Sequence, residues 1–403
     1  MKKIIIIMSL CLAMLFSVIG CNNSDKKESV DTLDGKKSNI IEVASVSPLS
    51  GNNAAFGEVL TNGANMAVDE RKEEFKDMGF KLVLKTYDDQ ADASVGVSTA
   101  RNLINEKDVL AVMGHFNSGV AIPSSEVYKE DNLLMMSPAN TAVEITERGI
   151  KSVNRIVARD DLQGPVAAKF SVEDLKASKI FIVDDKTDYG TGIGNEYKKT
   201  VEQLKSEVVG YESLSVGDTD FSGILAKIAS KKPDLVFFAG VCPEGPMLLK
   251  QMREKGIKSK FLGPDGIDSS DTPKIAKDNV IGIYYTSTAG PCTDTKKGKE
   301  WAAKYEKEFN KEPENYAAYG YDAMIMSLDA IKKAIEDNDV KKPTRLQVTN
   351  AARELPAYDG IATKVELDEK GDNKEASVFI YKYEKAEYPA DVLKTISAKE
   401  FKK

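Results

Sequence analysis

The sequence is poor in the residues that most metal sites and disulfide-stapled folds need. One of its 403 residues is His and four are Cys, two of them within the first 21 positions. A single imidazole excludes a site built on several His ligands, and so few Cys exclude a disulfide scaffold. Basic residues are outnumbered, with 56 Lys and Arg against 63 Asp and Glu and a net charge of −7. Because an acidic body is repelled by phosphate backbones, no nucleic-acid partner is expected.

Long apolar runs are also missing after residue 21, since no stretch approaches the roughly 20 residues that a helix needs to cross a bilayer. The remaining composition, 42% hydrophobic and 30% charged, is that of a globular chain. At about 150 residues per domain, the length predicts two to three domains. We therefore expect a soluble body.

The N-terminus carries a short apolar segment of its own. Two lysines precede an uncharged run over residues 4–18, which is too short for a span and typical of an export signal. Gly20 and Cys21 close the run as in a bacterial lipobox, where the Cys is lipidated and becomes the first mature residue. We predict a lipoprotein signal peptide over 1–20 and a lipidated Cys21; a plain signal peptide and a signal anchor are the alternatives.

The residues that follow Cys21, up to residue 38, are polar and charged with almost nothing apolar to bury. Such a segment cannot form a core and is expected to be a flexible tether over 21–38. Acyl chains on Cys21 would then hold the folded body at the extracytoplasmic face of the cell membrane.

From Asn39 onward, short apolar runs alternate with longer segments of helical periodicity. The expected strands are residues 40–46, 81–85, 109–113, 133–136, 180–183 and 235–238. The expected helices are residues 54–75, 93–104, 119–129, 162–176, 191–206, 219–230 and 244–255. Strands separated by helices of this length imply βαβ units and parallel sheets. Two such sets predict two α/β lobes.

The last quarter of the chain breaks this alternation. Helices are expected over 297–309, 316–337 and 343–354, and strands over 365–367 and 376–383, joined by a turn at 368–372. Because no linker separates the two sets, we expect the chain to pass between the lobes more than once. The predicted division is residues 39–159 with about 289–365 in lobe 1, and 160–288 with about 366–403 in lobe 2.

The loops that follow the predicted strands carry the functional signal, because ligands of open α/β sheets bind beyond the carboxyl ends of the strands. These loops combine Gly, Ser, Thr and Asp with a few aromatic residues. Their segments are SPLSG (47–51), YDD (87–89), MGHFNSG (113–119), MMSPAN (135–140), DKTDYGTG (185–192), PE (243–244) and FLGPDG (261–266).

These segments, with QGPVAAK (163–169), DTDFSGIL (218–225) and DEKGD (368–372), resemble the leucine/isoleucine/valine-binding protein family in order and spacing. The family comprises type I periplasmic binding proteins, the substrate-binding lipoproteins of branched-chain amino-acid ABC importers. The resemblance covers most of the mature chain. It implies two Rossmann-like lobes with parallel sheets around a ligand cleft, a monomer, and no cofactor or metal.

The residue types in these loops suit an α-amino acid. A carboxylate needs several donors, which a helix N-terminus supplies together with a favourable dipole. Ser118 stands where such a helix begins, and Ala139 and Thr141 lie before the next one, with backbone N–H groups and a hydroxyl. An ammonium group needs an acceptor, preferably charged, and Asp265 provides one.

The resemblance implies the same roles. Positions matching Ser118, Ala139 and Thr141 hold the α-carboxylate and part of the ammonium group in the family. Asp265, followed by Gly266, stands where the family more often has Glu. Tyr189 matches an aromatic residue that packs on the ligand, and Phe56 matches an aromatic residue at the mouth of the first lobe.

Two departures from the family pattern concern specificity. Val241 replaces a Tyr and Ala317 replaces a Phe, and both changes are expected to enlarge the side-chain pocket. A larger apolar ligand such as Phe or Met, beside Leu, is then compatible with the site, unless Tyr316 or Tyr319 refills the space.

Other departures concern Cys. Ala91 and Asn117 occupy the positions of a family disulfide, which is therefore absent. Cys242 and Cys292 both follow strands of the second set, and their spacing allows either a disulfide or two free thiols.

Several residues also have ordinary structural readings. His115 is taken as structural, because no motif supplies a nucleophile for it. The glycines at 190, 192 and 194 miss the spacing of a dinucleotide loop. Asp265, Asp268 and Asp271 lack the order of an EF-hand loop, and Ser118 and Thr141 have the alternative role of helix N-caps.

The sequence thus predicts a binding protein and not an enzyme: a lipid-anchored receptor that closes on an apolar L-amino acid and delivers it to a membrane permease with its ATPase. The alternative is a sensory or regulatory receptor on the same fold, binding an amide, a urea or another small polar compound.

Overall fold

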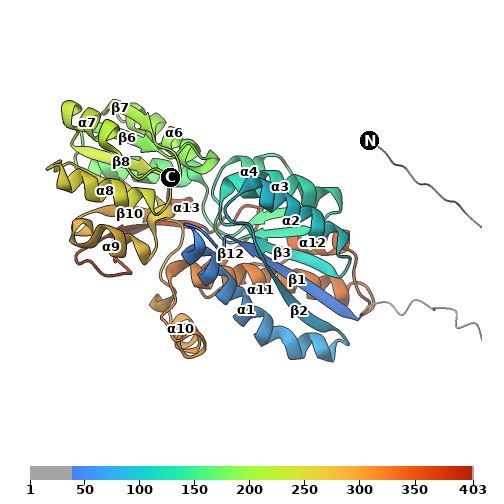
Figure 1. Cartoon of the computed structure of the whole chain (residues 1–403). Helices are drawn as coiled ribbons and strands as arrows, with labels where there is room; N and C mark the ends of the chain where they lie inside the picture. The colour runs from blue at the N-terminus through green and yellow to red at the C-terminus, as the bar shows by residue number, and fades with distance from the viewer. Residues whose placement is uncertain (1–38, 402–403) are drawn as a thin grey trace, which may run out of the picture. The chain divides into compact units, whose positions relative to one another are not determined.

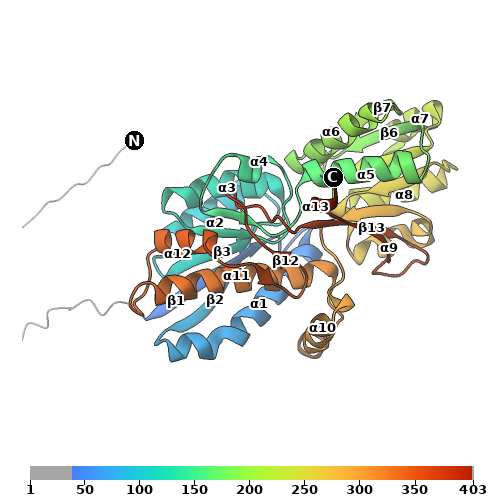
Figure 2. The ribbon, with the colours of Figure 1, turned by 180° about the vertical axis from the view of Figure 1, so that it is seen from behind.

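The computed structural model describes residues 39–401, which belong to one compact unit (Figure 1). Two separate sheets, each flanked by helices, form its two halves, so the predicted class of two α/β lobes is confirmed (Figure 2). The predicted signal peptide, Cys21 and the tether lie outside the described residues. Within residues 39–401, no helix combines the length and apolarity needed to span a bilayer.

The first sheet is wholly parallel, in the order β2-β1-β3-β4-β5. Its strands are β1 (Ile40–Ser47), β2 (Lys81–Asp88), β3 (Val109–Gly114), β4 (Leu134–Ser137) and β5 (Val153–Arg155). Every residue of β3 and β4 is buried, as expected of inner strands covered on both faces.

The second sheet has the order β14-β13-β10-β9-β8-β6-β7. Its strands are β6 (Lys179–Asp184), β7 (Glu207–Ser213), β8 (Leu235–Ala239), β9 (Lys260–Gly263), β10 (Tyr284–Ser287), β13 (Ser377–Lys382) and β14 (Asp391–Ser397). Strands β13 and β14 are antiparallel and the others parallel. A separate two-stranded ribbon joins β11 (Tyr358–Asp359) and β12 (Lys364–Val365).

The helices surround these sheets. They are α1 (Ala54–Asp77), α2 (Ala93–Asn105), α3 (Ser118–Glu130), α4 (Glu144–Glu147), α5 (Asp160–Lys169), α6 (Asp188–Gln203), α7 (Ser222–Lys231), α8 (Glu244–Glu254), α9 (Asp271–Ala276), α10 (Lys296–Phe309), α11 (Asn315–Glu336), α12 (Arg345–Arg353) and α13 (Ala398–Phe401).

Helix α11 packs on α1 and on β3 and β4, although it follows strands β6 to β10 of the second sheet in the chain (Figure 1). Glycines permit the close approach of the two helices: a Cβ on Gly63 would lie 2.0 Å from the Ala317 carbonyl oxygen, and one on Gly320 would lie 2.3 Å from the Leu60 carbonyl oxygen. The chain therefore passes between the sheets three times, after β5, after β10 and after β12. The residue bounds given above for the two lobes stay a prediction.

Strands β5, β7, β11 and β14 escaped prediction, and β9 and β10 were expected only through the residues that follow them, without bounds. β7 and β14 are edge strands with partly or mostly exposed side chains, so neither contains a continuous apolar run. β5 is three residues long and ends in Arg155. The two strands predicted on either side of the turn at 368–372 do not pair with each other as a hairpin. Instead, β12 pairs with β11, and β13 pairs with β10 and β14. A single bridge between Leu367 and Asn373 closes the turn.

Candidate functional site

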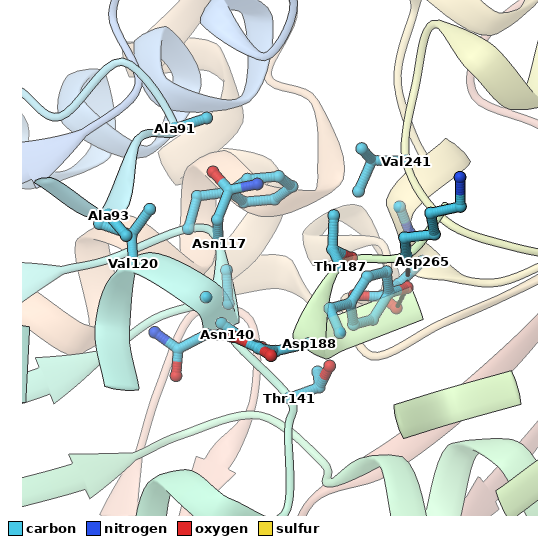
Figure 3. A pocket seen from close by; sticks show the side chains of 17 residues that line it. Ala91, Ala93, Asn117, Val120, Asn140, Thr141, Thr187, Asp188, Val241 and Asp265 are labelled. Atoms are coloured by element: carbon cyan, nitrogen blue, oxygen red, sulfur yellow. Dashed lines mark hydrogen bonds between the residues drawn. The ribbon is translucent and has the colours of Figure 1, made fainter. Parts of the chain in front are cut away.

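A cavity of about 290 Å³ lies between loops of the two sheets (Figure 3). Loops that follow β2, β3 and β4 line it from the first sheet, and loops that follow β6, β8 and β9 line it from the second. The lining residues are Ala91, Ala93, Phe116, Asn117, Ser118, Gly119, Val120, Ala139, Asn140, Thr141, Lys186, Thr187, Asp188, Tyr189, Val241, Asp265 and Gly266. The carboxyl ends of both sets of strands thus meet at one cavity, as the rule for open α/β sheets requires.

Most of the residues predicted from the sequence line this cavity. They are Ser118, Ala139, Thr141, Tyr189, Val241, Asp265 and Gly266. Phe56 does not line it. Its buried ring stacks on Phe116, with ring centroids 4.3 Å apart, and Phe116 lines the cavity in its place. Ala317 does not line it either, since it is buried where α11 meets Gly63 of α1.

Helix α3 presents its N-terminus to the cavity. Ser118 is its first residue, preceded by Asn117 as an N-cap that makes no side-chain capping bond. The Ser118 hydroxyl accepts a hydrogen bond from the Ala142 amide (3.2 Å) in the neighbouring loop, which leaves its own hydrogen free to donate. A helix of 13 residues thus directs its positive end toward the cavity. Ser118 therefore does not cap α3.

Asp265 is the buried acid of the second-sheet side, with 4% of its surface exposed. Tyr189 donates from its hydroxyl to one carboxylate oxygen (2.5 Å) and Tyr316 donates to the other (2.7 Å). The Gly266 amide in turn donates to the Tyr189 hydroxyl (3.1 Å). Burial raises the pKa of Asp265 above its ordinary value, although the two tyrosine hydrogen bonds act in the opposite direction.

Asp160, which we did not predict, is a second buried acid at this place. It is 1% exposed, and neither of its carboxylate oxygens accepts a hydrogen bond within residues 39–401. Burial, and then the negative charge of Asp265, raise the pKa of Asp160 well above its usual range. The Thr141 hydroxyl lies beside it and also lacks a hydrogen-bond partner in this part of the chain. Asp160 was not predicted because the strand before it, β5, was not recognised in the sequence. With β5 recognised, Asp160 would have counted among the residues that follow the carboxyl end of a strand.

The wall beyond these polar groups is largely apolar. Phe116, Val120 and Val241 line it, and Phe116 is supported by Phe56 and by Tyr316, whose ring centroid lies 6.0 Å away. Of the two tyrosines predicted to refill the space left by Ala317, Tyr316 packs in this aromatic cluster. We expect a wall of this kind to accept an apolar group.

The two sides also touch each other. Asn53, just before α1, donates from its side-chain amide to the Cys242 carbonyl after β8 (3.0 Å). Asn117 donates in turn to the Asn53 side-chain oxygen (3.1 Å). At the mouth of the cavity, a Cβ on Gly119 would lie 3.2 Å from the Asp188 carboxylate, so α3 and α6 approach closely. These contacts join the first-sheet side to the second-sheet side.

The remaining candidate groups have structural surroundings. His115 is fully buried between the Asp89 carboxylate (2.7 Å) and the Tyr128 hydroxyl (3.1 Å), and it does not line the cavity. Gly190 lies inside α6, where a Cβ would meet the Ala239 carbonyl oxygen at 2.5 Å. In residues 39–401, no three His, Cys, Asp or Glu side chains are grouped to hold a metal ion. Cys242 and Cys292 are buried free thiols.

Residues 40–387 match the family model described as periplasmic binding protein. The chain is 36% identical over 338 residues to the Leu/Ile/Val-binding protein homolog 1 of Brucella abortus, covering 84% of this chain and 89% of that protein. It is 32% identical over 346 residues to the leucine-, isoleucine-, valine-, threonine-, and alanine-binding protein of Pseudomonas aeruginosa, covering 86% and 90%. A solved leucine-binding protein from Thermotoga maritima, 25% identical, covers 89% of this chain and 99% of that chain with a TM-score of 0.80.

Proposed function

The chain belongs to the periplasmic binding protein family, and on that premise we propose that it is the substrate-binding lipoprotein of an ABC importer for an apolar L-amino acid. One observation carries the proposal. A single cavity joins a helix N-terminus, which favours an anion, to the buried Asp265 carboxylate, which favours a cation, and a second buried acid, Asp160, lies close enough to Asp265 to feel its charge. An α-amino acid carries both charges on adjacent groups.

The ligand carboxylate is proposed to lie at the N-terminus of α3. The Ser118 hydroxyl has a hydrogen to donate, and the first backbone N–H groups of a helix have no partner within it. The loop after β4 adds the Thr141 backbone N–H, and Ala139 lines the cavity beside it while its own N–H donates to the Ser137 hydroxyl (3.4 Å). Donors that converge in this way bind a carboxylate through charge-assisted hydrogen bonds.

The ligand ammonium is proposed to lie against Asp265, with the Thr141 hydroxyl and Asp160 as further acceptors. Asp265 is held in place by Tyr189 and Tyr316, whereas Asp160 and Thr141 have unused hydrogen-bonding capacity. A cation in this position would relieve the cost of two buried acids, since a buried charge needs a partner.

The ligand side chain would meet Phe116, Val120 and Val241. A cavity of about 290 Å³ is at the lower end of the range of about 300–1,000 Å³ typical of small-molecule sites. We infer a branched-chain amino acid, with a larger apolar or aromatic one compatible. The names of the relatives from Brucella and Pseudomonas point to the same ligand class.

Ligand binding between the two sides would favour a closed state that a permease with its ATPase recognises. We further propose that lipidated Cys21 anchors a monomer at the extracytoplasmic face of the membrane, and that the protein catalyses no reaction. A sensory receptor for an amide or urea on the same fold is the alternative, and the two buried acids that suit an ammonium group weigh against it.

The test is a thermal-shift and calorimetric screen of the full chain in detergent against the twenty amino acids, after unfolding and refolding to remove carried-over ligand. A ligand at 100 times its Kd should stabilise the native state by about 2.7 kcal/mol. Stabilisation by Leu, Ile, Val, Phe or Met is expected. Stabilisation by acetamide or urea, with none by any amino acid, would favour the alternative.

A further inference from the structure

Arg155 ends β5 without reaching the cavity, and its guanidinium is fully buried. All five of its N–H donors are used. One nitrogen donates to the carbonyl oxygens of Asn140 (3.3 Å) and Ala142 (2.8 Å). The others donate to one carboxylate oxygen of Asp372 (3.0 and 2.7 Å) and to the Thr146 hydroxyl (2.9 Å). A planar fork with five donors suits such a set of acceptors.

Asp372 holds this guanidinium from the turn at 368–372. Its second carboxylate oxygen accepts from Thr146 (2.8 Å) and Arg159 (2.8 Å). Burial alone would raise its pKa, but the two arginines keep the pKa of Asp372 below its usual value. The turn is further tied to β5, because the Arg155 amide donates to the Gly371 carbonyl (2.8 Å). The ion pair is therefore fixed on both sides.

The loop that Arg155 holds is the one proposed to bind the ligand carboxylate. Arg155 takes the carbonyls of Asn140 and Ala142, and the Asp160 amide takes the carbonyl of Thr141 between them (3.0 Å). In a planar trans peptide the C=O and the following N–H point in opposite directions. Fixing the Asn140 carbonyl on the guanidinium therefore directs the Thr141 N–H away from it. The Thr141 carbonyl, held by Asp160, likewise directs the Ala142 N–H toward Ser118.

We propose that Arg155, held by Asp372, is a positioning residue for the ligand carboxylate: by fixing the Asn140 and Ala142 carbonyls it orients the loop so that the Thr141 N–H and the Ser118 hydroxyl, itself held by the Ala142 N–H, converge on one anion. This inference rests on the proposed function. Arg155 acts by fixing the loop and does not touch the ligand. A positive charge at this position is therefore insufficient to orient the loop without the guanidinium fork.

Arg155→Lys tests this directly, because it retains the charge and loses the fork. The probe is L-leucine labelled with ¹³C at the carboxyl carbon, bound to the full chain in detergent. The variant is expected to weaken leucine binding by about tenfold, as for the loss of hydrogen bonds to a charged group. At saturation, the bound carboxyl resonance should move toward that of free leucine, while leucine labelled at Cα keeps its bound resonance.

Arg148→Lys is the matched control. Arg148 also donates to backbone carbonyls, at Ile122 (3.0 Å), Glu144 (3.0 Å) and Ile145 (3.3 Å), but it does not contact the 140–142 loop. It should change neither the leucine Kd nor the carboxyl resonance, whatever it does to stability.

The outcomes separate this inference from the function on which it rests. An Arg155→Lys protein with an unshifted carboxyl resonance would overturn the inference alone, whether or not its affinity falls. Failure of the wild-type protein to bind leucine would overturn both. If Arg155→Lys does not fold, Asp372→Asn replaces it as the test, because this change weakens the hold on the guanidinium. Asp372→Asn is expected to shift the same carboxyl resonance, and an unshifted resonance would overturn the inference.

Discussion

The side-chain amide nitrogen of Asn53 lies 3.0 Å from the carbonyl oxygen of Cys242, so a residue that precedes α1 donates a hydrogen bond across the cavity to a residue that follows β8. Because this bond joins the two sides directly, it exists only while they are close together. It therefore contributes to the closed state and not to either side by itself.

Replacing Asn53 by Ala should weaken amino-acid binding by about fivefold, since a neutral hydrogen bond contributes about 1 kcal/mol. Calorimetry measures the affinity, and small-angle scattering of the liganded protein measures closure. Asn62→Ala is the control, because Asn62 bonds to Tyr305 (3.3 Å) and makes no contact across the cavity. Equal affinities for the two variants would show that the Asn53 bond does not stabilise closure.

Replacing Asp265 by Asn should weaken binding by about 2–3 kcal/mol, roughly a hundredfold, because the ammonium group loses its charged acceptor. Asp160→Asn should give a smaller loss in the same direction. Asp188→Asn is the charge-matched control, since Asp188 lies exposed at the cavity mouth. Calorimetric titration with L-leucine measures all three, and a loss in the Asp188 variant as large as that in the Asp265 variant would mean that only net charge matters.

Amino-acid binding should release protons. Burial raises the pKa of both Asp160 and Asp265 in the free protein, so each holds its proton to higher pH than an ordinary carboxyl does. A bound ammonium favours the ionised forms and lowers those pKa values. Affinity should therefore rise with pH until the free carboxyls are themselves ionised. Calorimetry in two buffers of different ionisation enthalpy counts the protons, and heats that are the same in both buffers would contradict the coupling.

Replacing Val241 by Tyr should narrow the range of ligands. Val241 lines the cavity and packs on Gly266, where a Cβ would lie 2.8 Å from a Val241 methyl group. A ring at this position should lower the affinity for Phe and Met roughly tenfold or more, because overpacking costs about 1–3 kcal/mol. The affinity for Val and Ala should not change. Competition binding measures the ranking, with Val241→Ile as the conservative control. An unchanged ranking in the Tyr variant would remove Val241 from the specificity wall.

Asp268 should make the stability of the fold depend on pH. Its buried carboxylate accepts from Ser287 (2.6 Å), Asn315 (3.1 Å) and Tyr388 (3.0 Å), and burial raises its pKa to about 7. The unfolded chain releases this proton near pH 3.9. Between the two values the folded state holds the extra proton, so rising pH lowers its stability, by about 1.4 kcal/mol per unit.

The stability of the Asp268→Asn protein relative to the wild type should therefore increase as pH rises from 4 to 7. Above pH 7 the difference in stability should stay constant. Chemical denaturation across this range measures the difference, and a difference that does not vary with pH would contradict the raised pKa. The comparison uses the two proteins at each pH, because other carboxyls change the stability of both alike.

The family and the loops of the site were predictable because the inner strands of a parallel sheet are recognisable in the sequence as short apolar runs. Strands such as β3 and β8 are fully buried and apolar, and the residues that follow them, including Ser118 and Val241, line the cavity. Asp160 was missed for the converse reason. The strand before it is three residues long and contains Asn154 and Arg155, whose burial depends on partners distant in sequence.

The exchange between Phe56 and Phe116 could not be read from the sequence either. The two rings stack, and which of them faces the cavity depends on how α1 enters and on Tyr316, which belongs to a helix much later in the chain. The burial of Ala317 away from the cavity could not be read from the sequence either, since it depends on the close approach of the α11 backbone to Gly63 of α1.

The buried thiols have a practical consequence. Burial raises the pKa of Cys242 to about 12 and that of Cys292 to about 11, so neither is a ready nucleophile. A cysteine introduced at exposed Asp188 would then be the one readily alkylated sulfhydryl between residues 39 and 401. Because Asp188 stands at the rim where α3 and α6 approach, an environment-sensitive dye attached there would brighten or dim as the rim opens and closes. The protein thereby offers a scaffold for an optical sensor of the amino acid that it is proposed to bind.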